Sequence, residues 1–332
     1  MSKDKITIEP NSNYHRIAGS DLFKSNDKDF MEYRRKWVEW PRDFYLGDFP
    51  LFIDIETTSA CNLRCPFCAT TWRAEKIKKG FVKFDIVKKI IDEGFENGLY
   101  GVKFNVRGEP LLHPEIDKFI RYAKKKGLKD VYFNTNGMLL TEEVSKKLID
   151  AGLDRISISF EGHTKDVYEK YRVGARYETV LGNIENLQLL KSKLSVKYPR
   201  IRIQTVMLPD IKCDFEAYRK FWIRRVDEVG FLDYKDMKNK KRGIQYPWAC
   251  PQIWQRMCVF WDGTILPCNH DDDALLALGN AGDISIKEAW HSEKLNAVRD
   301  AHKKGVSHTI PACNGCYLRD SEICKLTEKE QI

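Results

Sequence analysis

From residue 51 onward, short apolar runs alternate with longer stretches whose apolar residues recur at helical spacing. The short runs predict strands, and the longer stretches predict amphipathic helices. This alternation is typical of βα units around a parallel sheet, so we expect an α/β fold. The expected strands cover residues 51–56, 102–106, 131–135, 155–160, 201–207 and about 231–234. The expected helices cover residues 85–97, 114–126, 142–151, 177–193 and 214–226, and Gly127 and Gly152 stand at helix ends that favour positive φ.

The two ends of the chain differ from this pattern. Residues 1–50 are first polar and then aromatic and basic, so we expect an extension whose aromatic side chains pack on the main domain; covering a substrate is the alternative. Residues 51–235 form the main domain. Residues 236–332 are dense in cysteines and turns, which predicts a small second domain. It should contain a hairpin, with strands over 257–261 and 264–267, and a helix over 285–303.

The composition is that of a globular protein, with 332 residues of which 42% are hydrophobic. The first residues are polar, so we expect no secretory signal, and no apolar run approaches the roughly 20 residues that cross a bilayer. We therefore expect a cytoplasmic protein, in which the ten cysteines serve better as metal ligands than as disulfides. The net charge of +8 comes from lysine and arginine runs typical of solvated surfaces, so we expect neither a membrane nor a nucleic-acid partner.

Three cysteines, Cys61, Cys65 and Cys68, follow the first predicted strand at spacings of four and three residues. Three thiolates on one loop leave a fourth metal position open, whereas a structural zinc site and an electron-transfer 4Fe–4S cluster each take four protein ligands. A chance trio of core thiols, or half of a zinc site, is the alternative. With the aromatic Phe67 just before the third cysteine, the spacing resembles the signature of the radical SAM enzymes.

The resemblance implies a partial (β/α)6 barrel, similar to an open TIM barrel, with the cysteine loop at the carboxyl end of its first strand. In that family the three thiolates hold a 4Fe–4S cluster whose open iron binds S-adenosylmethionine (SAM). Reductive cleavage of SAM then gives a 5′-deoxyadenosyl radical. The electron would come from a flavodoxin- or ferredoxin-type protein.

Other segments resemble cofactor-binding motifs of the same family. Residues 106–110 are similar to its Gly-Gly-Glu-Pro motif, with Arg107 in place of the first glycine, and residues 135–137 are similar to its Thr-Asn-Gly motif. Two serines on one face of the fourth strand, and an arginine suited to binding the SAM carboxylate, extend the resemblance. Plain turns and core packing are the alternatives at several positions. The resemblance assigns cofactor binding to Phe67, Gly108, Glu109, Asn134, Asn136, Ser157, Ser159, Arg172 and Met207.

A second group of four cysteines lies in the C-terminal part of the chain. With the segment between them, they resemble a SPASM or shorter twitch domain, in which four thiolates hold an auxiliary 4Fe–4S cluster. Zinc bound by the same four thiolates is the alternative. Cys258 and Cys324 do not complete the seven-cysteine pattern of domains with two auxiliary clusters, so we expect one. The four candidate ligands are Cys250, Cys268, Cys313 and Cys316.

The resemblance implies an enzyme that abstracts a hydrogen atom from its substrate. Because the accessory domain is compact and no peptide-recognition module precedes the barrel, we expect a small polar substrate, such as a sugar, sugar nucleotide or aminocyclitol, that is oxidised or epimerised. Cys213 and Cys258 are candidate hydrogen-atom donors, and Asp271, with its neighbours His270 and Asp272, is the candidate base. A peptide maturase is the alternative, as is a non-catalytic protein with two zinc sites. The C-terminal cysteine pattern differs from that of a molybdenum-cofactor cyclase, which we do not expect.

Overall fold

The computed structural model describes residues 7–8, 14–19, 27–234, 248, 250–319 and 322. Six parallel strands form the centre of its sheet, in the spatial order β8-β7-β6-β5-β4-β3. This order follows the chain and confirms the expected partial (β/α)6 barrel. The six strands are β3 (Phe52–Ile55), β4 (Gly101–Lys103), β5 (Asp130–Thr135), β6 (Arg155–Ser159), β7 (Arg200–Val206) and β8 (Glu228–Leu232).

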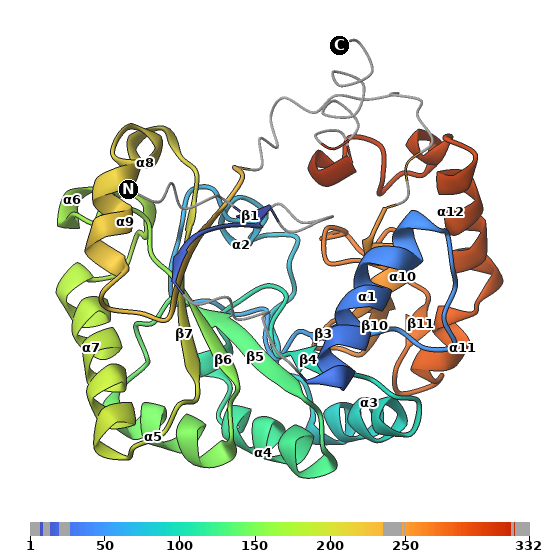
Figure 1. The fold of residues 1–332 in the computed structure, drawn as a ribbon. Coiled ribbons are helices and arrows are strands. Elements are labelled where there is room, and N and C mark those ends of the chain that lie inside the picture. Colours follow the sequence, from blue (N-terminus) through green and yellow to red (C-terminus); the bar gives the residue numbers. More distant parts are fainter. Residues whose placement is uncertain are drawn as a thin grey trace.

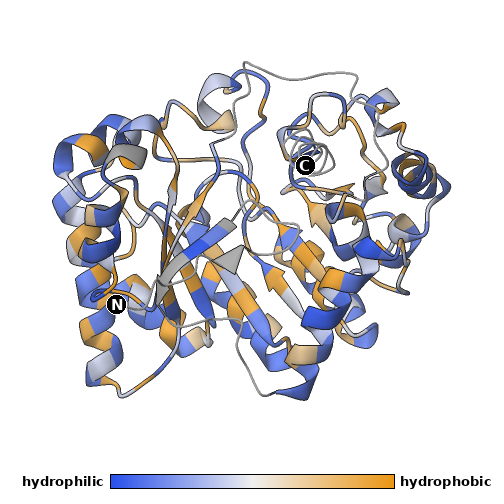
Figure 2. Cartoon of the chain, turned by 45° about the horizontal axis from the view of Figure 1, so that its top comes forward, coloured by the Kyte–Doolittle hydropathy of each residue, from blue (hydrophilic) through white to orange (hydrophobic). Residues whose placement is uncertain are grey.

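Helices surround these strands on the outside (Figure 1). Hydrophobic and hydrophilic residues alternate along them, as Figure 2 shows, and their apolar faces pack on the sheet. As predicted, α4 and α5 end at Gly127 and Gly152, both in the left-handed conformation. The helices of the barrel are α2 (Ala69–Trp72), α3 (Phe84–Glu96), α4 (Ile116–Lys126), α5 (Glu142–Ala151), α6 (Lys165–Tyr171), α7 (Tyr177–Lys193), α8 (Pro209–Cys213) and α9 (Phe215–Trp222), with the short 3-10 helix η1 (Pro110–Leu112).

Several element boundaries differ from the sequence expectation. The strand expected near 231–234 begins earlier, at Glu228. Its first residue is a charged glutamate, which does not fit an apolar strand pattern, but the carboxylate is buried and paired with Arg202. The helix expected over 285–303 is wrong as a single element: α11 (Ile286–Trp290) and α12 (Glu293–Lys303) are separate. Ser292 causes the break, since its hydroxyl accepts a hydrogen bond from Leu295 N and begins a new helix.

Both edges of the sheet carry strands that the βα pattern does not predict. At one edge β2 (Tyr14–Gly19) pairs antiparallel with β8, and β1 (Thr7–Ile8) pairs with β2. At the other edge β9 (Arg256–Val259) pairs parallel with β3, so the C-terminal part continues the barrel sheet. The predicted hairpin is confirmed by β9 and β10 (Thr264–Leu266), followed by β11 (Gly279–Asn280). The 3-10 helix η2 (Ser307–Thr309) follows α12.

The N-terminal helix α1 (Lys28–Arg42) lies between the barrel and the C-terminal part (Figure 1). Its Tyr33 and Trp37 pack with Phe52 of β3, which fits the expectation that the aromatic residues cover the main domain. Gln255 of α10 (Gln252–Gln255) donates to Trp37 O at 2.5 Å, which ties the helix to the C-terminal part. The domain boundaries at 50 and 235 stay predictions. Within the described residues, no helix has the length and apolarity that a membrane span requires.

Candidate active site

The inner face of the barrel encloses a cavity of about 470 Å³. Side chains alternate between the two faces of each strand, and here most of those that point inward are polar, while the outward ones that pack on the helices are apolar. The lumen is therefore a lined space and not a packed hydrophobic core. The strand residues that line it are Phe52, Lys103, Asp130, Tyr132, Asn134, Arg155, Ser159, Arg202, Gln204, Leu232 and Arg256.

The loop after β3 places Cys61, Cys65 and Cys68 on the wall of this cavity. Leu63 N donates to Cys61 Sγ at 3.5 Å, and Cys68 Sγ lies 3.1 Å from Thr70 Oγ1. Burial raises the pKa of the Cys61 thiol, and raises that of Cys65 to about 11. Such thiols ionise when a cation binds them, and iron supplies that charge. The three side chains and their donors thus fit the cluster that the sequence predicts.

The loop after β4 brings Gly108 and Glu109 to the same cavity. Gly108 has a φ of +68°, and a Cβ at this position would lie 2.2 Å from Thr58 O, so glycine is required. The Glu109 carboxylate accepts hydrogen bonds from Thr135 Oγ1 at 2.6 Å and Asn136 N at 2.8 Å. Burial raises the pKa of this carboxyl, and these donors oppose the rise. A fixed carboxylate on the cavity wall suits an ammonium group such as that of SAM.

Arg172 lies beside the cysteine loop and lines the cavity. Its guanidinium pairs with both carboxylate oxygens of Glu161, and the Nη2–Oε1 distance is 2.8 Å. Its Nη1 lies 3.7 Å from Cys65 Sγ, and its guanidinium carbon lies 5.5 Å from the centre of the Phe67 ring. To bind a SAM carboxylate, Arg172 would therefore have to divide its N–H donors between that carboxylate and Glu161.

The other predicted cofactor residues fall into two groups. Ser157 is buried on the strand face that carries Ser159, so both serines face the lumen side of the sheet. Met207 and Phe67 lie outside the residues that line the cavity: Met207 N donates to Leu232 O at 2.8 Å, and Phe67 lines a neighbouring cleft. Those that line the cavity are Gly108, Glu109, Asn134, Asn136, Ser159 and Arg172.

The second cysteine group also converges. The negative charges of Cys268, Cys313 and Cys316 each raise the pKa of the Cys250 thiol, after burial, which is the larger cause, so the four sulfurs are near neighbours. Burial likewise raises the pKa of Cys268 to about 12. A four-thiolate set of this kind fits an iron–sulfur cluster, whose thiolates attach to different irons. In the part of the chain that the structure describes, no group of three or more His, Cys, Asp or Glu side chains is arranged around a single ion.

Two of the predicted catalytic residues, Asp271 and Cys258, are not among the residues that line the lumen cavity. The Asp271 carboxylate accepts hydrogen bonds from Leu275 N at 3.0 Å and Leu276 N at 2.7 Å, so it caps a turn and faces a separate cleft of about 320 Å³. Cys258 is fully buried on β9. Cys213 ends α8, but its side chain is outside the described residues, as is Cys324. Hydrogen donation and base catalysis by these residues stay predictions.

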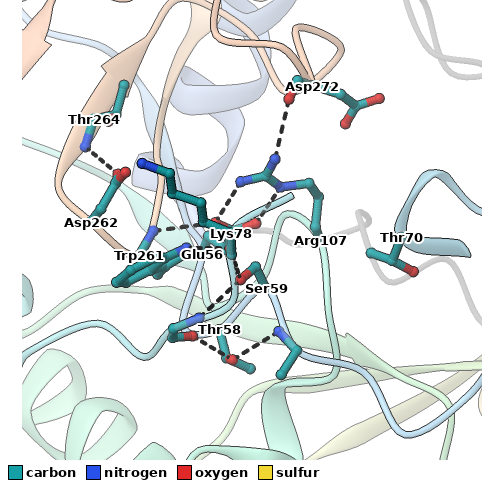
Figure 3. A network of polar contacts seen from close by, with 12 residues as sticks. Glu56, Thr58, Ser59, Thr70, Lys78, Arg107, Trp261, Asp262, Thr264 and Asp272 are labelled. Atoms are coloured by element: carbon teal, nitrogen blue, oxygen red, sulfur yellow. Dashed lines mark hydrogen bonds and ion pairs between the residues drawn. The ribbon is translucent and has the colours of Figure 1, made fainter. Parts of the chain in front are cut away.

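A polar network joins the cysteine loop to the C-terminal part, and Figure 3 shows its members. Arg107 donates to both oxygens of the buried Glu56 carboxylate, at 2.6 and 2.9 Å, and to Asp272 O at 3.2 Å. Trp261 N donates to Glu56 at 3.2 Å, and the Trp261 indole donates to Lys78 O at 3.1 Å. This role of Arg107 was not predicted from the sequence. Its signal is Arg107, a charged residue where the family motif has glycine.

The charged lumen is a second feature that the sequence analysis missed. Arg155 donates to both oxygens of Asp130, at 2.8 and 2.6 Å, and Arg202 pairs with Glu228. The signal was in the sequence, because Arg200, Arg202 and Gln204 alternate with isoleucines and place polar side chains on one face of a central strand.

Comparisons with known proteins agree with this site. A family model for the radical SAM superfamily matches residues 55–211, and one for an iron–sulfur cluster-binding domain, SPASM, matches residues 250–317. An AdoMet-dependent heme synthase from Methanosarcina barkeri is 34% identical over an alignment of length 329. The match covers 81% of this chain and 92% of the heme synthase. A probable GTP 3′,8-cyclase from Methanococcus maripaludis is 33% identical over an alignment of length 264, and the match covers 68% of this chain and 87% of the cyclase.

Among solved structures, the fold is similar to that of Streptococcus suis SuiB bound to S-adenosylmethionine, with a TM-score of 0.64 and 16% identity. The match covers 91% of this chain and 80% of SuiB. The matched relatives carry different reactions in their names, so they settle the family and not the substrate. The chain belongs to the radical SAM superfamily, and its cofactors are a SAM-bound 4Fe–4S cluster and auxiliary iron–sulfur binding in a SPASM domain.

Proposed function

We propose that this chain is a radical SAM oxidoreductase or epimerase whose substrate is a small polar molecule held in the barrel lumen. The cavity carries the proposal: it measures about 470 Å³, within the roughly 300–1,000 Å³ typical of small-molecule sites. Its walls bear carboxylate, guanidinium, amide and hydroxyl groups on rigid strands. Such groups suit a substrate with several hydroxyl or charged groups, such as a sugar, a sugar nucleotide or an aminocyclitol.

Different residues of the cavity wall would bind the cofactor and the substrate. Cys61, Cys65 and Cys68 would hold the SAM-binding cluster, and Glu109 would bind the ammonium of SAM. When bound, the cluster and SAM supply a radical that removes a hydrogen atom from the substrate. The polar side chains of the strands would orient the substrate carbon towards the cysteine loop.

The proton acceptor for a dehydrogenation is best placed at His270. Of the three candidates after Cys268, His270 lines the lumen cavity, while Asp271 and Asp272 line the neighbouring cleft. Imidazole is the side chain most often used as a general base in enzymes. A His270→Asn variant should therefore retain SAM cleavage and lose substrate oxidation.

A peptide substrate is the other candidate within the family. The cavity volume of about 470 Å³ favours a small molecule over an extended chain, and we therefore place the peptide second.

Formation of 5′-deoxyadenosine by the anaerobic, cluster-loaded protein tests the proposal. With SAM and a strong reductant, the protein should form 5′-deoxyadenosine, and a substrate should accelerate its formation. A substrate deuterated at the reacting carbon should transfer deuterium into the 5′-deoxyadenosine. A panel of sugars, sugar nucleotides, aminocyclitols and short peptides identifies the class. Acceleration by peptides alone would overturn the small-molecule proposal. No 5′-deoxyadenosine from fully loaded, reduced protein would overturn the assigned chemistry.

A further inference from the structure

Two cations in the barrel lumen share a single carboxylate. Asp54 Oδ2 lies 3.3 Å from Lys103 Nζ and 3.4 Å from Arg256 Nη1. Asp54 is fully buried, and Lys103 and Arg256 line the cavity. We call Lys103 and Arg256 the cation pair. Two positive charges against one negative charge leave an excess of one positive charge on the wall of the cavity.

The cation pair keeps hydrogen-bonding capacity for a ligand. Charge-assisted hydrogen bonds between nitrogen and carboxylate oxygen are usually about 2.7–2.9 Å long, and both contacts to Asp54 are longer. Asn269 Nδ2 also donates to the same oxygen, at 3.0 Å, which uses part of its capacity. Arg256 Nε is buried and makes no hydrogen bond to any described residue. The long contacts therefore leave Lys103 and Arg256 with donors that Asp54 does not saturate.

Aromatic packing also holds the arginine of the pair. The Arg256 guanidinium carbon lies 4.7 Å from the centre of the Trp37 ring and 5.9 Å from that of Phe52. Such contacts fix a guanidinium without neutralising its charge. Arg34, on the same helix as Trp37, lines the same cavity. The N-terminal helix therefore contributes the Trp37 ring that packs on Arg256.

Two other arginines that line the lumen each have a carboxylate partner. Arg155 pairs through two hydrogen bonds with Asp130, and Arg202 pairs with Glu228. An uncompensated charge in a poorly solvated place costs free energy unless a ligand offsets it. The imbalance at the cation pair therefore marks a position for an anion.

We infer that the cation pair binds an anionic group of the substrate, either a carboxylate or a phosphate. This inference rests on the proposed function, since it concerns the same cavity, and it narrows the substrate to small polar molecules that carry a negative charge. Neutral sugars would leave the excess charge unmatched. Cationic N–H donors bind a carboxylate and a phosphate in the same way, so the experiment tests one ligand of each kind.

Calorimetric titration of the anaerobic, cluster-loaded, SAM-bound protein tests the inference. The ligands are glucose 6-phosphate, glucuronate and glucose, which share a sugar ring and differ in charge. At least one charged sugar should bind about tenfold more tightly than glucose, as expected for one added charge-assisted contact. Preference for glucose 6-phosphate indicates a phosphate, and preference for glucuronate indicates a carboxylate. Equal binding of all three, or no binding of either charged sugar, would overturn the inference.

Variants of the cation pair separate recognition from structure. Lys103→Met and Arg256→Met should each weaken the charged sugar about tenfold and leave glucose unchanged, and Arg256→Lys should restore part of the loss. Lys146→Met, at an exposed position on α5, is the matched control and should change nothing. If the charged and neutral sugars weaken equally, the residues are structural and the inference fails. Iron content and SAM-dependent 5′-deoxyadenosine formation are measured on the same samples, so a failure of the proposed chemistry is seen separately.

Discussion

The Glu56–Arg107 ion pair gives a sharp test of how the cysteine loop is held against the C-terminal part. Glu56 follows β3, and Arg107 lies on the loop that also carries Gly108. Their two hydrogen bonds, and the bond from Trp261 N to Glu56, connect the barrel with the hairpin of the auxiliary domain. The substitution Glu56→Gln removes the negative charge while keeping nearly the same shape.

The expected cost follows from burial. Glu56 is fully buried and the Arg107 side chain is 9% exposed, so solvent does little to replace the lost partner. Removing one member of such a pair costs about 3–5 kcal/mol, because the remaining charge stays buried. At about 2–4 °C per kcal/mol for domains of this size, the thermal midpoint should fall by about 6–20 °C. The double variant Glu56→Gln with Arg107→Met should lose less than the sum of the single variants, since both charges are then absent.

Thermal unfolding of the anaerobic, cluster-loaded protein, followed by circular dichroism, measures the effect. Glu143→Gln is the matched control: it breaks the exposed pair with Lys147 on α5 and should leave the midpoint unchanged. If Glu56→Gln unfolds at the same temperature as Glu143→Gln, the network does not hold the two parts together. Strict additivity of the two single variants would show that Glu56 and Arg107 do not act as a pair.

Three other predictions concern the cofactor end of the cavity. Replacing Cys61, Cys65 and Cys68 together by alanine should remove one cluster and leave the auxiliary one, which iron analysis and absorbance measure; retention of the full iron content would contradict the assignment. Burial raises the pKa of Glu109, so protonation on lowering the pH below neutral should weaken SAM binding, whereas Glu109→Gln should bind SAM weakly at every pH. Binding of SAM to wild type that is independent of pH would refute this role. Gly108→Ala should reduce SAM affinity, because the positive φ and the nearby carbonyl leave no space for a Cβ; calorimetry that finds unchanged affinity would show that the loop yields freely.

The barrel strands and their helices could be predicted because periodicity is a local property. The apolar runs from β3 to β7 are short and bounded by polar turns, and glycines mark the ends of α4 and α5. The edges of the sheet could not be predicted in this way. β9 pairs with β3 across about two hundred residues of chain, and nothing in the local pattern of Arg256 to Val259 encodes that partner. The break at Ser292 was missed because the apolar periodicity continues across it.

The site was predictable where one short motif carries the chemistry. The three cysteines of the first loop lie together on the cavity wall because they are only four and three residues apart in the chain. The surroundings of Asp271 could not be predicted in this way: its carboxylate accepts hydrogen bonds from Leu275 N and Leu276 N, and its role as a base stays a prediction. The partners of Arg107 and Arg256 also lie far away in sequence, on Glu56 and Asp54, so their roles required the fold.

The distribution of charge gives the clearest link between this fold and its function. The interior of a closed TIM barrel is filled by packed branched apolar side chains. Here the corresponding strand face carries Lys103, Asp130, Arg155 and Arg202, and each ion pair there is weak support for stability because desolvation offsets its attraction. A purely structural lumen would gain from apolar residues of similar size. The charged lining therefore supports our proposal of a bound molecule, in which Glu109 would meet a cation at one position and the cation pair would meet an anion at another.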